Sequence, residues 1–181
     1  DRFKCDLYMT QAEFLTSTLM MSYTGENVPA AAIQFYHRAG FSAEQLENYQ
    51  KRFGGFGRFT APLPHNYQRL SDRQTLAIGN RYWQVVVGQG HSPEHACLYC
   101  PALQLVIAGD QILPRITPNV SVFPTEPDGN PLEGWLTSNA RLLNILPDDL
   151  LVLPAHQAPF HGVRVRLNQI IDSHRMALAK L

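Results

Sequence analysis

The stretch GQGHSPEHACLYCPALQLVIAGDQILPRI, residues 88–116, places a histidine and an aspartate each directly behind a glycine at the end of an apolar segment. His91 follows the predicted strand YWQVVV, and Asp110 follows the predicted strand LQLVIA. A third candidate, His156, follows the apolar run LLVLPA in a similar way. Strands hold their ends firmly, whereas the loops behind them leave room for a ligand. Three such residues therefore indicate a functional site more strongly than any one of them does.

The chemistry of these three side chains is that of metal ligands. Imidazole nitrogens and a carboxylate bind zinc, iron or manganese. The glycine in front of His91 and of Asp110 lets the chain turn sharply and direct each side chain inward. Taken singly, each residue is better explained as the cap of a loop, and this alternative stays open. Together they predict part of a metal site.

The composition is that of a globular protein. The chain has 181 residues, of which 45% are hydrophobic and 17% charged, and 15 basic residues balance 15 acidic ones. This neutral balance gives no support for a nucleic-acid or membrane partner, and no apolar run approaches the roughly 20 residues that span a bilayer. Three cysteines suit a reducing compartment, so we expect a cytoplasmic protein. The start at Asp1, without a methionine, leads us to expect a cut inside a longer protein.

Two regions differ in their pattern. Residues 10–65 are predicted to form a helical insertion followed by a loose linker rich in glycine and proline, with helix starts at Thr10 and Ser42. From residue 75 to 181, apolar strands alternate with helical patterns, which favours an α/β sandwich with helices outside a sheet.

The ordered motifs GHSPEH, GDQILPRI and VLPAHQAPF resemble the second half of the metallo-β-lactamase superfamily, whose members read G-H-[ST]-P-G-H, then [SA]-G-D, then L-P-G-H-G. The resemblance extends over about residues 76–181. It implies the C-terminal part of an αββα sandwich that carries a helical insertion. The superfamily's H-x-H-x-D-H motif is absent from the sequence, and the opening DRFKCDLYM resembles the segment behind that motif. We therefore expect the chain to start just after it.

The resemblance also implies roles for the site residues. His91 would complete a three-histidine set on a first metal, Asp110 would bridge two metals, and His156 would bind the second. The parent protein would be a glyoxalase-II-like hydrolase of a small ester or thioester, acting by a metal-bound hydroxide with two zinc, iron or manganese ions. The chain alone would bind metal weakly or not at all and would be inactive or nearly so.

Other features leave alternatives open. Ala155 and Gln157 replace both glycines around His156, and Glu94 replaces the second glycine of G-H-[ST]-P-G-H; the changes around His156 slightly favour a non-catalytic binding or assembly module that kept the fold and lost the metals. A di-iron oxidoreductase and a nuclease are weaker alternatives, since the chain offers neither a flavin domain nor a basic patch. Arg115 could equally bind an anionic group of the substrate or pair with a structural carboxylate.

Two further expectations concern packing. Cys97 and Cys100 form C-x-x-C without a second pair, which favours buried thiols over a metal site. His95 is expected to support the loop that orients His91. Because half of a two-sheet core would be missing, an apolar sheet face and edge would be exposed. We expect them to be covered by self-association through that sheet, by a partner segment or by repacking of the helical block.

Overall fold

The computed structural model describes residues 4–180, and its architecture is the mixed α/β one predicted. Asp1, where we expect a cut, and Leu181 at the end of the last helical pattern lie outside the described residues. The chain divides into two compact units, one comprising the residues up to Gln68 with Val122–Gly129, and the other Arg69–Ser121 with the residues from Asn130 onward. No helix in the described part is long and apolar enough to cross a membrane.

The first unit is mainly helical. It contains α1 (Gln11–Ser22), α2 (Ala30–Arg38), α3 (Ala43–Arg52) and the single turn α4 (Phe56–Phe59), and strand β1 (Tyr8–Thr10) forms a two-stranded sheet with β2 (Gln68–Leu70). The short helix α4 corrects the expectation of a loose linker in this part of the chain. Gly54, in the left-handed conformation at φ +65°, ends the preceding segment and allows this extra turn.

The two predicted helix starts in this unit have different outcomes. At α3 the capping box is present: Gln45 N donates to Ser42 Oγ at 3.2 Å, and Ser42 N donates to Gln45 Oε1 at 2.8 Å. Helix α1 also begins directly behind Thr10, but the Thr10 side chain makes no capping hydrogen bond. Thr10 ends strand β1 and is 2% exposed, so its side chain belongs to the packing of the strand.

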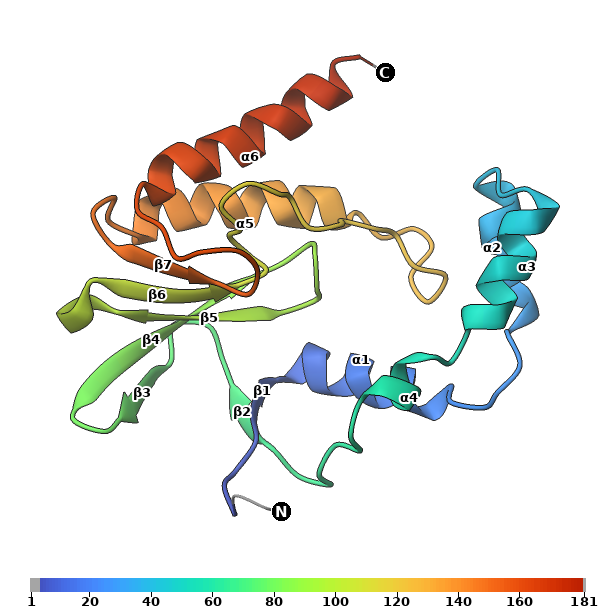
Figure 1. The fold of residues 1–181 in the computed structure, drawn as a ribbon, viewed down its shortest axis with the longest axis horizontal. Coiled ribbons are helices and arrows are strands. Elements are labelled where there is room, and N and C mark those ends of the chain that lie inside the picture. The colour runs from blue at the N-terminus through green and yellow to red at the C-terminus, as the bar shows by residue number, and fades with distance from the viewer. Residues whose placement is uncertain (1–3, 181) are drawn as a thin grey trace. The chain divides into compact units, whose positions relative to one another are not determined.

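The second unit contains the sheet that carries the site. Its strands lie in the order β3 (Thr75–Ile78), β4 (Arg81–Gly88), β5 (His95–Cys100), β6 (Leu105–Gly109) and β7 (Leu151–Pro154). The first four strands pair antiparallel, whereas β7 pairs parallel to β6. Strands β4, β6 and β7 therefore run in the same direction and end at the same edge of the sheet (Figure 1). The three candidate residues all follow these ends.

Helices α5 (Pro131–Ile145) and α6 (Val163–Leu178) cover one face of this sheet (Figure 1). The core between them is apolar and combines Val86, Cys97, Tyr99, Val106, Ala108 and Val152 from the sheet with Ile112, Leu142, Leu146, Leu150, Val163 and Leu167. Cys97 and Cys100 are both buried free thiols, as predicted. Burial raises the pKa of the Cys97 thiol to about 12, which keeps it protonated and inert.

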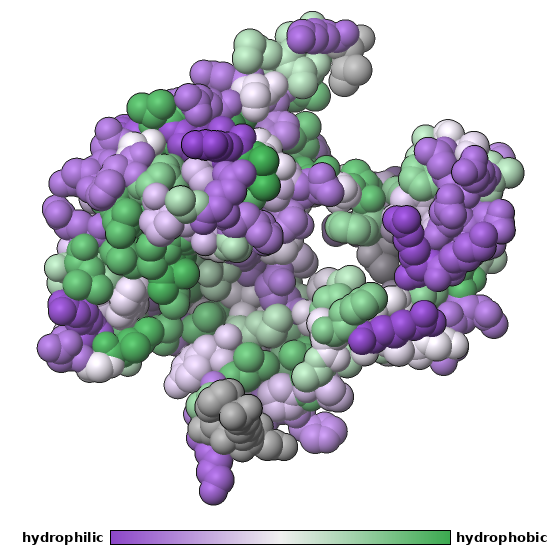
Figure 2. All heavy atoms as spheres, viewed as in Figure 1, coloured by the Kyte–Doolittle hydropathy of each residue, from purple (hydrophilic) through white to green (hydrophobic). Residues whose placement is uncertain are grey.

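The opposite face of the sheet is also apolar. Val85, Leu98, Ile107 and Leu153 are aligned across four neighbouring strands. In this row Val85 is 0% exposed, Leu98 and Leu153 are partly buried and Ile107 is 41% exposed, and neither α5 nor α6 packs on this face. Figure 2 shows hydrophobic side chains at the surface over the strands of this unit. A sheet with two apolar faces needs cover on both.

We propose that a second copy of the chain covers this face. Sedimentation of the purified protein should show a concentration-dependent dimer, and Ile107→Lys should shift the equilibrium to monomer because it places a charge in the apolar row. Val165→Lys is the matched control, since Val165 is 60% exposed on α6 and lies outside the row. A wild-type chain that stays monomeric at all concentrations would contradict this proposal.

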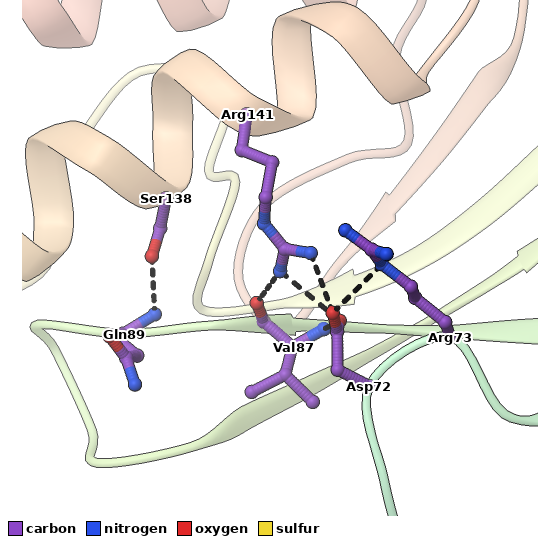
Figure 3. Close-up of polar contacts among 6 residues, drawn as sticks. All are labelled: Asp72, Arg73, Val87, Gln89, Ser138 and Arg141. Atoms are coloured by element: carbon purple, nitrogen blue, oxygen red, sulfur yellow. Dashed lines mark hydrogen bonds and ion pairs between the residues drawn. The ribbon is translucent and has the colours of Figure 1, made fainter.

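A polar clamp fastens α5 to the end of β4 (Figure 3). Arg141 donates from Nη1 to Asp72 Oδ2 at 2.8 Å, from Nη2 to Asp72 Oδ1 at 3.1 Å, and from Nη2 to the carbonyl of Val87. Val87 N donates to Asp72 Oδ1 at 2.8 Å. Partial burial tends to raise the pKa of Asp72, but the hydrogen bonds from Arg141 and Val87 and the Arg141 charge outweigh it, so that the pKa is lowered.

Asp72→Asn should lower the free energy of unfolding at neutral pH by about 1 kcal/mol, because the half-exposed pair is partly screened by water. A lowered pKa stabilises the fold above the ordinary carboxyl pKa of about 4, and this contribution is lost as the pH falls through the lowered value. The difference between wild type and variant in urea unfolding should therefore shrink in acid. Asp172→Asn on α6 is the control, and a difference that is the same at all pH values would refute the charge-based account.

Candidate metal centre

The structure brings His91, Asp110 and His156 together at the shared edge of the sheet. His91 Nε2 lies 3.8 Å from Asp110 Oδ2, and His156 Nε2 lies 3.4 Å from Asp110 Oδ1. Each imidazole thus faces a different oxygen of the same carboxylate. Both separations exceed the 2.7–3.2 Å that is usual for a direct N–H···O hydrogen bond.

The environment of the three residues is open. The side chains of His91 and Asp110 are 30% and 28% exposed, and that of His156 is 65% exposed. Solvent and a small molecule can therefore reach the carboxylate, and His156 is the least enclosed of the three.

The tautomer of His91 is fixed by the backbone. Its Nδ1 lies 2.8 Å from the carbonyl oxygen of Asn119, and only a protonated nitrogen can donate to a carbonyl. In the neutral ring the lone pair is then on Nε2, which faces Asp110. A lone pair and a carboxylate that face each other are both acceptors, so the arrangement suits a cation between them. A metal-ligating histidine is held in this way, with its other nitrogen bound to a carbonyl.

These donors fit a metal as part of a ligand set. Among residues 4–180, no group of three or more His, Cys, Asp or Glu side chains is arranged so that it could hold a metal ion. The two histidines approach opposite oxygens of Asp110, so they do not surround one point. Nitrogen and oxygen donors of the right kind are present, but a centre of four or more ligands requires others.

The turn that carries Asp110 is held by His95. Gln111 N donates to the carbonyl of Ala108 at 3.0 Å and closes the turn, in which Gly109 has a φ of +53°. His95 Nε2 lies 3.1 Å from the same carbonyl, and its ring occupies the space that a side chain at residue 109 would need. The structure thus places this contact of His95 beside Asp110.

The turn that carries His91 is held by α5. Gly90 has a φ of +107°, and a Cβ atom there would lie 2.5 Å from Trp135 Cβ. One residue earlier, Gln89 N donates to Ser138 Oγ at 2.9 Å (Figure 3). Gly90 was visible in the sequence, but Trp135, which packs on it, and Ser138, which binds Gln89, were not, because only the tertiary fold brings them there.

The substitutions around His156 leave the backbone in a glycine-like conformation. Gln157 adopts a φ of +71°, which favours glycine, although it replaces the second glycine of the motif. Strain of this kind persists where the surrounding structure enforces it.

Arg115 lies near the site in sequence and is exposed. It follows the Asp110 turn in a segment that Arg166 holds by two hydrogen bonds. Arg166 Nε donates to the carbonyl of Leu113 at 2.6 Å, and Arg166 Nη2 donates to the carbonyl of Ile116 at 2.8 Å. Within the described chain, Arg115 has no carboxylate within ion-pair distance. Its role in substrate binding stays a prediction.

Comparison with known proteins gives the family. The model of the metallo-beta-lactamase superfamily matches residues 25–156, so the chain belongs to that superfamily. A comparison of the sequence with curated proteins finds no match.

Solved structures share the fold over nearly the whole chain. A beta-lactamase domain protein from Burkholderia ambifaria is 38% identical, with a TM-score of 0.73 over 95% of this chain and 46% of its own. A metallo-beta-lactamase family protein from Thermus thermophilus is 22% identical, with a TM-score of 0.76 over 97% of this chain and 55% of its own. The chain thus spans about half the length of these two structures. A further protein, solved in a di-iron-bound form, is 21% identical with a TM-score of 0.55 over 93% of this chain and 66% of its own.

Gly109→Ala should destabilise the protein more than a positive φ alone explains, since the new methyl group meets His95. We expect Gly79→Ala, at a φ of +61° with nothing within 4 Å, to cost about 1 kcal/mol of unfolding free energy. Gly109→Ala should cost about 2 kcal/mol more. Equal losses for the two variants in chemical denaturation would show that His95 does not constrain the turn.

Proposed function

We propose that this protein is a metal-dependent hydrolase of a small ester or thioester, with His91, Asp110 and His156 among its metal ligands. The observation that supports it is the approach of both Nε2 atoms to one carboxylate, with the His91 tautomer set by Asn119. Membership of the metallo-beta-lactamase superfamily makes hydrolysis the reaction to test first.

Each residue has a distinct part in this proposal. Asp110 would bridge two ions, His91 would bind one of them and His156 the other, and the ions would be zinc or, as alternatives, iron or manganese. When bound, such ions acidify water and polarise the carbonyl of the substrate. Arg115, exposed beyond the Asp110 turn, binds an anionic part of the substrate.

The chain by itself offers three of the ligands that two ions would need. We therefore propose that the 181-residue chain binds metal weakly and has little activity alone. The low cysteine content and the inert buried thiols agree with a cytoplasmic location, which we also propose.

A non-catalytic binding or assembly module is the second candidate. Two observations favour it: His156 is 65% exposed, and Ala155 and Gln157 stand on either side of it in place of glycines. The metal-binding measurement separates the two functions.

His91→Ala and His156→Ala should each weaken zinc affinity by at least about tenfold, because each removes one of few ligands. Zinc content after loading and desalting, and competition with a chromophoric chelator, provide the measurement, with thioester hydrolysis as a second assay. His37→Ala on α2 is the matched histidine control. Unchanged zinc affinity in both site variants would reject the metal site and favour the binding module.

In a longer form of the protein that supplies the remaining metal ligands, Arg115→Ala should raise the KM for an anionic thioester by about fivefold and leave kcat unchanged, because a solvent-exposed ion pair contributes modestly to binding. The control is Arg81→Ala, an exposed arginine at the start of β4 and thus at the other end of the strand. A fall in kcat without a change in KM would contradict a role in substrate binding.

A further inference from the structure

The buried polar residues of the second unit all lie behind the candidate metal centre. Of the described residues, the buried polar ones are Thr10, Gln111, Ser138 and Asn139, and the last three belong to this unit. Gln111 directly follows Asp110, and Ser138 contacts the turn before His91. Burying a side-chain amide costs free energy unless the amide is hydrogen-bonded. The buried position of Gln111 therefore requires a reason.

Gln111 joins the Asp110 turn to α5. Its side chain is 0% exposed, and Nε2 donates to Asn139 Oδ1 at 3.4 Å. The Gln111 amide also fills the space where a side chain on Gly88, the last residue of β4, would project. Gln111 N also closes the turn around Asp110, so the buried side chain anchors the backbone from which the carboxylate projects.

Asn139 extends the connection to the His91 turn. Its Nδ2 donates to the carbonyl of Trp135 at 2.9 Å, and Trp135 backs directly on Gly90. A continuous path of buried contacts therefore runs from Asp110 through Gln111, Asn139 and Trp135 to the residue before His91.

Stability alone does not explain this amide pair. Gln111 Oε1 is buried without a hydrogen-bond partner within the described chain, which costs free energy. An apolar side chain of similar size would avoid that cost. The pair instead restricts orientation: the Gln111–Asn139 hydrogen bond is long at 3.4 Å, but Asn139 is also held at 2.9 Å by the Trp135 carbonyl, and both amides are fully buried.

We propose that Gln111 and Asn139 are positioning residues that set the separation of Asp110 and His91 and so the affinity for metal. The inference deepens the proposed function and rests on it where metal binding is concerned. The coupling of the two turns is a property of the protein without metal and can be measured separately.

The first experiment compares Gln111→Met, Asn139→Leu and the double variant for zinc affinity and thermal unfolding. Each single variant should weaken zinc binding about tenfold and lower the Tm, because it leaves a buried polar group of the other residue unpaired. The double variant should have a Tm unchanged or higher, since it removes the amide pair together with the unpaired acceptor Gln111 Oε1. The double variant should be no weaker than the worse single one, because the pair acts as a unit. Asn144→Leu is the matched control, as Asn144 also donates to the carbonyl four residues earlier on α5 but is exposed.

The second experiment is amide hydrogen exchange without metal. Gln89 and Gly90, whose amides are bonded to Ser138 Oγ and the Ser92 carbonyl, should exchange about tenfold faster in both single variants, while β5 stays protected. Uniformly faster exchange, or zinc affinity that falls only in step with the Tm, would overturn the inference. If wild type binds zinc no better than His91→Ala, the proposed function fails, and the exchange experiment still decides whether the turns are coupled.

Discussion

The parallel pairing of β7 with β6 is the constraint on which the candidate centre depends. Strand β4 already runs in the direction of β6, since two antiparallel pairings separate them. Only a parallel β7 adds its carboxyl end to the same edge and so brings His156 to the carboxylate of Asp110. An antiparallel β7 would carry His156 to the far end of the sheet. The apolar core under α5 and α6 is what keeps β7 in this register.

The fold could be predicted in large part because strands and helices have local signals. The alternation of strands and helices after residue 75, and the positions of His91, Asp110 and His156 behind strand ends, were predicted correctly from apolar patterns and turn residues. Contacts distant in sequence could not be predicted. Gln111 and Asn139 are 28 residues apart, and no sequence motif predicts that they lie in contact.

Local signals also failed where one residue type fits two structural roles. Thr10 fits a helix N-cap, yet it ends β1 and its side chain is buried, so strand packing determines its conformation. Gln157 shows the converse. The sequence departs there from the family's glycine, but the backbone keeps a positive φ because the loop behind β7 enforces it. A residue type indicates which backbone conformation has the lowest local energy at a position, and the tertiary structure decides which conformation the residue adopts.

The connection between β6 and β7 has a consequence for how the protein folds. It runs from Asp110 to Leu150 and includes α5, so the two halves of the candidate centre meet only after a long segment has closed. Closing such a segment costs chain entropy before the new strand pairing repays it, and parallel pairing across long loops is slow. The hairpin from β3 to β4 needs no such closure. We therefore expect the candidate centre to form late in folding, when β7 pairs with β6 and brings His156 to Asp110.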